Sequence, residues 1–259
     1  MMHMGFGRKW MVLAAFAFAG AAAAAESGHD AGVAWQEWRA GNDVTNTASL
    51  QRGASNFVNY CLSCHSLRLV RWSRVAEDLK IPTELLADTL LPEGASATDY
   101  IRSSFPAADA EAWFGRSPPD LSLAARSRSP DWIYQFLKGF FVDTTKVTGT
   151  NNLVLDGASM PAVLSDLEGV KVAVLAEHGQ GGGGHGAGPA VESFQYLSQG
   201  SMTPEQFDGF VRDTVNFLDY VGDPTQAERR HLGVWVILFL LVFTGFAWLL
   251  KREYWKDVH

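Results

Sequence analysis

The sequence predicts a mostly α-helical protein with long loops and one C-terminal transmembrane helix. Two observations lead to this class. Apolar residues recur at three- and four-residue spacing in several separate segments, which is the period of an α-helix, while the period-two alternation of strands is weak. Near the C-terminus, an uncharged apolar stretch is long enough to cross a hydrocarbon core. With 259 residues, the chain has room for one substantial domain or two small ones.

The first 25 residues have the composition of a secretory signal peptide. Arg8 and Lys9 form a short basic region, the run from Trp10 to Phe18 is apolar, and an alanine-rich stretch ends at Ala25. This order predicts export and cleavage after Ala25. A permanent N-terminal anchor is the alternative, which the weak apolarity of alanine and the Ala-x-Ala ending disfavour. We therefore expect residues 1–25 to be absent from the mature protein.

Three segments have the residue spacing of packed helices. They are residues 49–60, residues 130–141 and residues 204–221, and each carries one apolar face. The third segment also has a start signal, because Thr203 and Gln206 match a capping box. Apolar faces of this kind are more often core than binding site, so we interpret them as walls of a cofactor pocket at most.

Residues 231–250 are the predicted transmembrane helix. They contain no Asp, Glu, Lys or Arg. Trp235 and Trp248 lie near the two ends, where aromatic rings favour the membrane interface. The alternative is a buried helix of a globular core. The export signal places residues 26–230 on the periplasmic side and leaves residues 251–259 as a cytoplasmic tail.

The balance of charge excludes one class of partner. The formal net charge is −7, and loss of the two cations Arg8 and Lys9 with the signal peptide leaves −9. An acidic exported domain with no run of basic residues is a poor nucleic-acid binder but attracts basic proteins. We expect no nucleic-acid partner. Five acidic residues are either a docking rim for a basic partner or ordinary solvated side chains: Glu77, Asp78, Glu84, Asp88 and Glu93.

The only two cysteines lie in the motif Cys61-Leu62-Ser63-Cys64-His65. In an exported protein, a Cys-x-x-Cys-His motif is the signature of covalent haem attachment. Two thiols one helical turn apart each bond a vinyl group of the porphyrin, and the adjacent imidazole ligates the iron. A redox dithiol needs a βαβ context, and zinc needs further ligands at matched spacing. The motif therefore predicts one covalently attached haem c.

The second axial ligand is to be found among the methionines and histidines outside the signal peptide. Met202 has a structural explanation, because it precedes the N-cap Thr203 and pairs with Phe207 as a hydrophobic staple. Met160 lies in the loop-like stretch DGASMP, whose small residues let the backbone approach a flat cofactor, so we predict Met160 as the ligand. His/Met ligation leaves no open coordination position and indicates electron transfer. A histidine is the alternative ligand, and the candidates are His29, His178, His185, His231 and His259. His178 precedes the predicted surface loop Gly179–Gly188, and His185 lies within it.

A pair of prolines and two arginines lie between these motifs. The stretch SPPDLSL contains Pro119 and is followed by Arg126 and Arg128. Two prolines restrict the backbone against a ring edge. A guanidinium forms a paired hydrogen bond with a carboxylate such as a haem propionate. On the residues alone, the two arginines are equally well ordinary surface side chains.

Five motifs together resemble those of bacterial cytochrome c1: CLSCHS, PPDLSLAARSR, GASMP, TPEQFDGFVRDTVNFLDYVGDP and KREYWKDVH. The resemblance extends in the expected order from about Leu50 to His259. It implies a class I c-type cytochrome-like haem domain in which the Cys-x-x-Cys-His motif supplies both thioether bonds and one axial ligand, and Met160 supplies the other. It also places Arg128 at a haem propionate, with Arg126 as a less certain neighbour.

The resemblance implies a function in the bacterial inner membrane. The chain would carry single electrons from a Rieske iron–sulfur protein to a soluble or membrane-bound cytochrome c, as a subunit of a dimeric quinol–cytochrome c reductase that also contains cytochrome b. It would have no acid, base or nucleophile of its own. The main alternative is a tethered cytochrome subunit of a terminal oxidase or another dehydrogenase. A haem enzyme or gas sensor, which needs an open sixth position, and a structural subunit with a vestigial haem are further alternatives.

Overall fold

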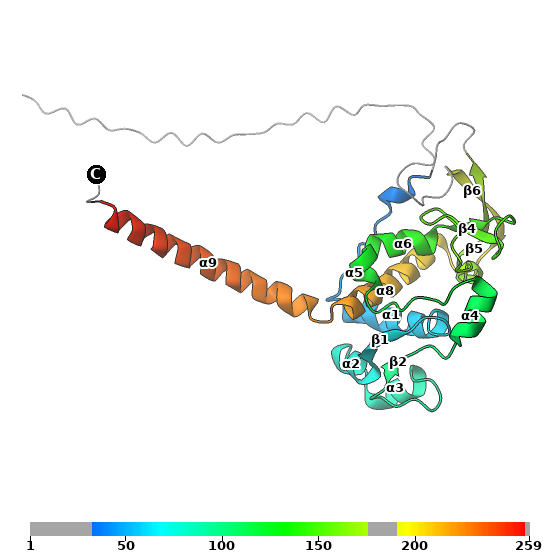
Figure 1. The fold of residues 1–259 in the computed structure, drawn as a ribbon, viewed down its shortest axis with the longest axis horizontal. Helices are drawn as coiled ribbons and strands as arrows, with labels where there is room; N and C mark the ends of the chain where they lie inside the picture. Colours follow the sequence, from blue (N-terminus) through cyan, green and yellow to red (C-terminus); the bar gives the residue numbers. More distant parts are fainter. Residues whose placement is uncertain (1–32, 176–190, 257–259) are drawn as a thin grey trace, which may run out of the picture. The chain divides into compact units, whose positions relative to one another are not determined.

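The computed structural model describes residues 33–175 and 191–256 (Figure 1). The predicted signal peptide, the glycine-rich segment 179–188 and the last three residues of the tail lie outside these ranges. The helices are a 3₁₀ turn (Trp35–Glu37), α1 (Thr47–Tyr60), α2 (Trp72–Asp78), α3 (Thr83–Thr89), α4 (Ala107–Phe114), α5 (Ala124–Arg128), α6 (Pro130–Lys138), α7 (Ser165–Glu168), α8 (Pro204–Gly222) and α9 (Gln226–Tyr254). The strands are β1 (Leu67–Arg71), β2 (Tyr100–Ile101), β3 (Phe140–Val142), β4 (Thr150–Asn152), β5 (Gly169–Leu175) and β6 (Val191–Gln199).

The close packing of α1 against α8 forms the centre of the main core (Figure 1). At Gly53 the two backbones approach so closely that an added Cβ would lie 2.0 Å from the carbonyl oxygen of Asp213. Beside this point the rings of Phe57 and Phe217 are 5.9 Å apart, and both side chains are buried. The predicted helix 49–60 is thus confirmed as α1, and its apolar face packs on α8.

A buried polar cluster reinforces the same contact. The carboxylate of Asp213 on α8 accepts hydrogen bonds from Ser49 Oγ (2.6 Å) and from Arg52 Nε (2.5 Å) and Nη2 (3.0 Å) on α1. Asn216, one helical turn further along α8, donates to Ser49 Oγ (2.9 Å). Because these hydrogen bonds run from one helix to the other, the cluster links α1 to α8 in one relative position.

The start of α8 confirms the capping box predicted from the sequence. Thr203 Oγ1 accepts the backbone N–H of Gln206 at 3.3 Å, and Gln206 Oε1 accepts the N–H of Thr203 at 2.9 Å. These bonds satisfy two donors that a helix start leaves unpaired. Met202 packs partly buried against the main core, as expected for the residue before the cap.

The prediction of a helix over 130–141 is wrong at its C-terminal end, and the sheet that follows was not predicted. Helix α6 begins at Pro130 with Ser129 as its N-cap and ends at Lys138. Phe140 and Phe141 then pair with β4 instead of continuing the helix. The strands β4, β3, β5 and β6 form one sheet in that order, with β3 antiparallel to β4 and parallel to β5. Strand pairing, with the nearby β4 and the more distant β5, outweighed the helical pattern here.

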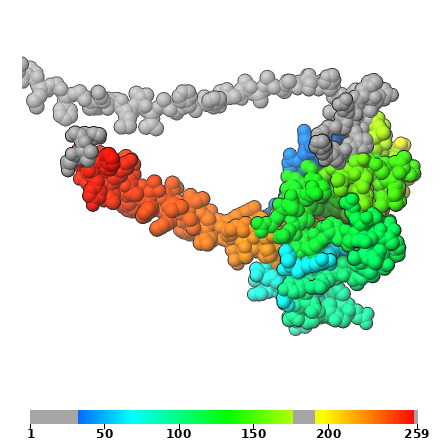
Figure 2. All heavy atoms as spheres, in the orientation of Figure 1, coloured from blue at the N-terminus to red at the C-terminus, as the bar shows by residue number. Residues whose placement is uncertain are grey.

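The predicted transmembrane segment 231–250 lies inside the longer helix α9, which begins at Gln226 and ends at Tyr254. None of its residues is buried, and Figure 2 shows its side chains, coloured orange to red, uncovered on the visible face. The helix is long and apolar enough to cross a membrane. The first residues of the predicted tail therefore continue the helix.

We predict that Gly53→Ala disrupts the haem domain. The new Cβ would overlap the Asp213 carbonyl, so α1 and α8 must separate. The expected loss is about 3 kcal/mol of unfolding free energy, as for overpacking of a tight core. The measurement is thermal and denaturant unfolding of the purified protein.

Gly209→Ala is the matched control for this prediction. Gly209 lies in α8 as well, and an added Cβ there meets no atom within 4 Å. Because alanine favours helix, the control should gain about 0.5–1 kcal/mol. Equal stability of the Gly53 variant and the wild type would show that the crossing is not as tight as described.

Candidate functional site

The cysteine motif forms a tight turn at the end of α1. The N–H of Cys64 donates to the carbonyl of Cys61 at 3.1 Å, and the N–H of His65 donates to the same carbonyl at 2.8 Å. Ser103 holds the turn from outside, because its Oγ donates to the Ser63 carbonyl at 2.7 Å. Leu62 points into the core and is buried. The two thiols and the imidazole are therefore held on one turn that α1 positions.

A hydrogen bond between His65 and Pro119 sets the orientation of the imidazole. His65 Nδ1 lies 2.8 Å from the carbonyl oxygen of Pro119. A carbonyl can only accept, so Nδ1 carries the proton and Nε2 keeps a free lone pair. Burial lowers the pKa of His65, while the Pro119 bond and the charge of Asp120 oppose that change. A neutral imidazole with Nε2 free is the form that ligates a metal.

The segment around Pro119 is itself bonded to the residues that follow His65. The carboxylate of Asp120 accepts the N–H of Arg68 at 2.8 Å, and the N–H of Leu121 donates to the Ser66 carbonyl at 2.9 Å. These bonds join two segments that lie about fifty residues apart in the chain. The proline pair thus holds His65 in place, a role that was not deduced from the sequence.

The two cysteines have the properties of attachment points more than those of a redox pair. Both are free thiols, and burial raises the pKa of Cys61 to about 12. Reactive dithiols depend on a lowered thiol pKa, so this environment disfavours thiol–disulfide exchange. Within residues 33–175 and 191–256, no group of three or more His, Cys, Asp and Glu side chains gathers as a zinc-type site.

Arg126 and Arg128 point into different surroundings although both lie on α5. The guanidinium of Arg128 lies 5.1 Å from the ring centre of Trp132. Arg126 lies against the end of α8, where its Cγ would be 3.2 Å from a Cβ added at Gly222. No carboxylate pairs with Arg128 in the part of the chain that the structure describes. Arg128 is therefore free to bind an anionic group.

Arg128 stands at one end of an aromatic row on α6. Trp132 and Phe136 are stacked, with ring centres 5.2 Å apart and planes 7° apart. Phe136 contacts Phe140 edge to face at 5.0 Å. The spacing of four residues puts Trp132 and Phe136 on one face of α6, and Phe140 follows on β3. Trp132 and Phe136 are only half-buried, which suits the wall of a flat cofactor pocket.

The loop that carries Met160 is held by two buried asparagines that sequence reasoning missed. Asn151 donates to Asp156 Oδ1 at 2.8 Å and accepts the N–H of Gly157 at 2.9 Å. Asn152, which is fully buried, donates to the Phe136 carbonyl of α6 at 2.8 Å. The adjacent Asn-Asn pair before a glycine turn was the only signal in the sequence.

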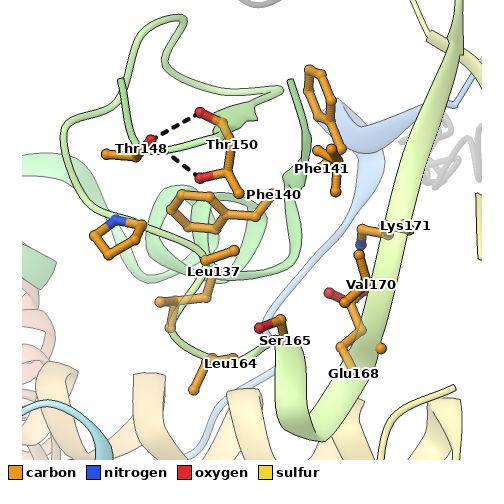
Figure 3. Close-up of a pocket in the computed structure, with 14 residues that line it drawn as sticks. Leu137, Phe140, Phe141, Thr148, Thr150, Leu164, Ser165, Glu168, Val170 and Lys171 are labelled. Carbon is orange, nitrogen blue, oxygen red and sulfur yellow. Dashed lines mark hydrogen bonds and ion pairs between the residues drawn. The ribbon is translucent and has the colours of Figure 1, made fainter. Parts of the chain in front are cut away.

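A cavity of about 250 Å³ is lined by residues of α6, β3 and β5 and of the loop that follows Met160 in the chain (Figure 3). Pro161 and Ala162 line it together with Leu137, Phe140 and Leu164. The lining does not include the cysteine motif or Met160, so this cavity is not the predicted haem site. Figure 3 also shows Glu168 and Lys171 beside it, an ion pair that is almost fully buried.

The acidic residues expected to form a docking rim lie in and around α2 and α3. Glu77, Glu84, Asp88 and Glu93 are exposed. Asp78 is engaged inside the protein, because its carboxylate accepts from Arg74 Nε (2.6 Å) and from the Tyr220 hydroxyl (2.8 Å). The rim is therefore reduced to the four exposed acids.

Comparison with known proteins decides between the possible families. The model of the cytochrome C1 family matches residues 38–258. A cytochrome c1 of Allochromatium vinosum is 44% identical over 217 residues, which is 84% of this chain and 87% of that protein. This chain belongs to the cytochrome c1 family. It is therefore a membrane-anchored c-type cytochrome that carries one covalently bound haem c and transfers electrons in a cytochrome bc1-type reductase complex with cytochrome b.

Two further relatives are similar to the chain. A protein of Nitrosomonas europaea named ammonia monooxygenase gamma subunit is 38% identical over 84% of this chain and 86% of its own length. A cytochrome b/c1 of Bradyrhizobium diazoefficiens is 27% identical over 82% of this chain, which corresponds to 33% of that longer protein. The site residues fit the cofactor of the family, since two free thiols and an imidazole with Nε2 available lie on one turn.

We predict that Asn152→Ala loosens the loop that carries Met160. The substitution removes a partly buried bond to the Phe136 carbonyl and the acceptor of a buried bond from the Val154 N–H. Loss of such bonds costs about 1–3 kcal/mol. Hydrogen exchange of residues 151–160 should accelerate.

Asn59→Ala is the control, since the Asn59 amide is exposed and bonds only to Ser55 on its own helix. Unchanged exchange of the loop in the Asn152 variant, or equal acceleration in both variants, would show that Asn152 does not hold the loop.

Proposed function

We propose that this chain accepts single electrons from a Rieske iron–sulfur protein and passes them to a soluble or membrane-bound cytochrome c. The observation that carries the proposal is the bond from His65 Nδ1 to the Pro119 carbonyl, because it leaves Nε2 as an iron ligand next to two free thiols. Membership of the cytochrome c1 family supports the assignment of the chain to a quinol–cytochrome c reductase complex. The reductase would be dimeric, as the family resemblance implies.

Each site residue has one role in this proposal. Cys61 and Cys64 would hold haem c through thioether bonds, and His65 Nε2 and the Met160 sulfur would both ligate its iron. With two protein ligands, the iron would serve electron transfer and not the binding of oxygen or peroxide. Arg128 pairs with a haem propionate, a role supported by its freedom from carboxylate partners in the described residues. Arg126 packs on α8 and is not needed for it.

The protein supplies orientation and exclusion of water. Haem c, when bound, supplies a one-electron change at iron and needs no proton from the chain. Pro119 holds the imidazole, the buried asparagines hold the Met160 loop, and the aromatic row of α6 covers the cofactor. A methionine ligand in an apolar setting raises the reduction potential, as an acceptor of quinol-derived electrons requires.

The proposed topology follows from the two terminal segments. Residues 1–25 direct export and are removed, residues 26–230 form the haem domain in the periplasm, and residues 231–250 span the bacterial inner membrane. Residues 251–259 stay in the cytoplasm. The apolar, unburied surface of α9 supports the span.

The test of the function is a reduced-minus-oxidised spectrum of the tagged chain, purified from its own membranes in mild detergent with quinol as reductant. We expect c-type and b-type bands together, both reduced by quinol. A c-type band alone that quinol fails to reduce would favour a terminal oxidase or another dehydrogenase.

We predict that Met160→Leu opens the sixth coordination position. The reduced variant should then bind carbon monoxide, and its midpoint potential should fall by on the order of 0.1 V because axial ligands set haem potentials. Absorption spectra under carbon monoxide and redox titration measure both effects.

Met202→Leu is the control and should change neither property, since Met202 packs beside the start of α8. Carbon monoxide binding by the unmodified reduced protein would instead indicate an open site and a haem enzyme or gas sensor.

A further inference from the structure

A pair of arginines gathers on the exposed face of the small β1–β2 sheet. The guanidinium carbon of Arg71 lies 4.3 Å from the ring centre of Tyr100, and that of Arg102 lies 6.0 Å from it. All three side chains are exposed. Leu69, also on β1, is 64% exposed, so an apolar side chain stands beside the charges. We call Leu69, Arg71, Tyr100 and Arg102 the basic patch.

The positive charge of the basic patch comes from Arg71 and Arg102. Neither Arg71 nor Arg102 pairs with a carboxylate in the described ranges, whereas Arg52, Lys138 and Lys171 each do. The interactions of Arg71 are with the Thr98 carbonyl, the Tyr100 hydroxyl and the Tyr100 ring. Asp99, the adjacent acid, accepts the Ser96 N–H at 2.8 Å. In a chain of net charge −7, the patch is thus a local site of opposite sign.

The basic patch borders the turn that holds the cysteine motif. Arg102 is followed by Ser103, whose N–H donates to Ser66 Oγ at 2.9 Å and whose hydroxyl bonds to the Ser63 carbonyl at 2.7 Å. On β1, the N–H of Arg68 is bonded to Asp120, next to the Pro119 carbonyl that orients His65. Both strands of the patch are therefore tied directly to the residues around the predicted axial histidine.

A redox partner must come close to the haem edge, and complementary charge raises the rate of such encounters. We propose that the basic patch docks a soluble electron-accepting protein with an acidic face. This inference rests on the proposed function, and it assigns the acceptor a charge opposite to the one suggested by the acidic rim. Haem c, when bound in its reduced form, would supply one electron and be oxidised, and the metal centre of the acceptor would be reduced by that electron, with no bond made or broken and no proton moved.

The exposed side chains of Leu69 and Tyr100 add apolar contact area to the basic patch. Transient partners meet through a few apolar side chains within a charged surround. Leu69 and Tyr100 supply the apolar part, and the two guanidiniums supply donors that pair with carboxylates. Arg68, whose Nε is 4.0 Å from the Asp120 carboxylate and whose side chain is 66% exposed, extends the positive charge along β1.

The test uses the intact complex in mild detergent and two soluble c-type cytochromes as probes, one acidic and one basic. The double variant Arg71→Gln/Arg102→Gln should bind the acidic probe more weakly in calorimetry. Its rate of reducing that probe at low ionic strength should fall about tenfold, and added salt should remove the difference. Reduction of haem c by quinol and its midpoint potential should not change.

Arg39→Gln is the matched control, because Arg39 is also an exposed arginine but lies in the N-terminal segment outside the β1–β2 sheet. It should leave binding and reduction of the acidic probe unchanged. An acidic probe that binds the double variant as tightly as the wild type overturns the proposal. So does a wild-type complex that binds only the basic probe, which would assign docking to the acidic rim.

Two further outcomes distinguish lipid contact and failure of the proposed function from failure of docking. If the double substitution matters only in phosphatidylglycerol nanodiscs and not in detergent, the patch contacts lipid and the docking proposal fails. If quinol does not reduce haem c in the unmodified complex, the proposed function fails, and calorimetry still decides whether Arg71 and Arg102 bind the acidic protein.

Discussion

The close approach of α1 to α8 at Gly53 is the contact on which the rest of the haem domain depends. Because no side chain separates the backbones there, the buried cluster around Asp213 can bond across the interface. Helix α1 ends directly in the cysteine motif, so the position of α1 on α8 sets the position of Cys61, Cys64 and His65. The covalent site is therefore placed by a packing constraint eight residues before it.

The second constraint is that two separate segments hold this turn, while a third contact holds the Met160 loop on α6. Pro119 orients the imidazole, Ser103 holds the cysteine turn, and Asn152 fixes the Met160 loop to α6. Each contact uses a backbone carbonyl or a short polar side chain, which leaves little freedom of rotation. Such rigidity suits electron transfer, where the protein keeps the ligands of the iron in one geometry and takes no part in bond making.

Charge is arranged differently inside the domain and on its surface. The pair Glu168–Lys171 lies beside the cavity, and burial raises the pKa of Glu168 and lowers that of Lys171 while their mutual attraction opposes both changes. Lys171 also donates to the Lys138 carbonyl, so the pair joins the sheet to α6. The chain as a whole carries more acidic than basic residues, and Arg71 and Arg102 form a positively charged area next to the turn of the cysteine motif.

The sequence by itself determined the features that depend on near neighbours in the chain. Haem attachment follows from the spacing of two cysteines and a histidine, and helices α1, α8 and α9 follow from local periodicity, caps and length. Only the tertiary structure decided the features that depend on distant residues. Phe140 and Phe141 lie in β3, which pairs with β5 as well as with β4 and does not continue the predicted helix. The tautomer of His65 is set by the Pro119 carbonyl, 54 residues away. The tertiary structure also gave Arg126 and Arg128 different neighbours, Gly222 and Trp132. Contacts of this kind depend on how distant segments pack, and packing leaves no periodic signal along the chain.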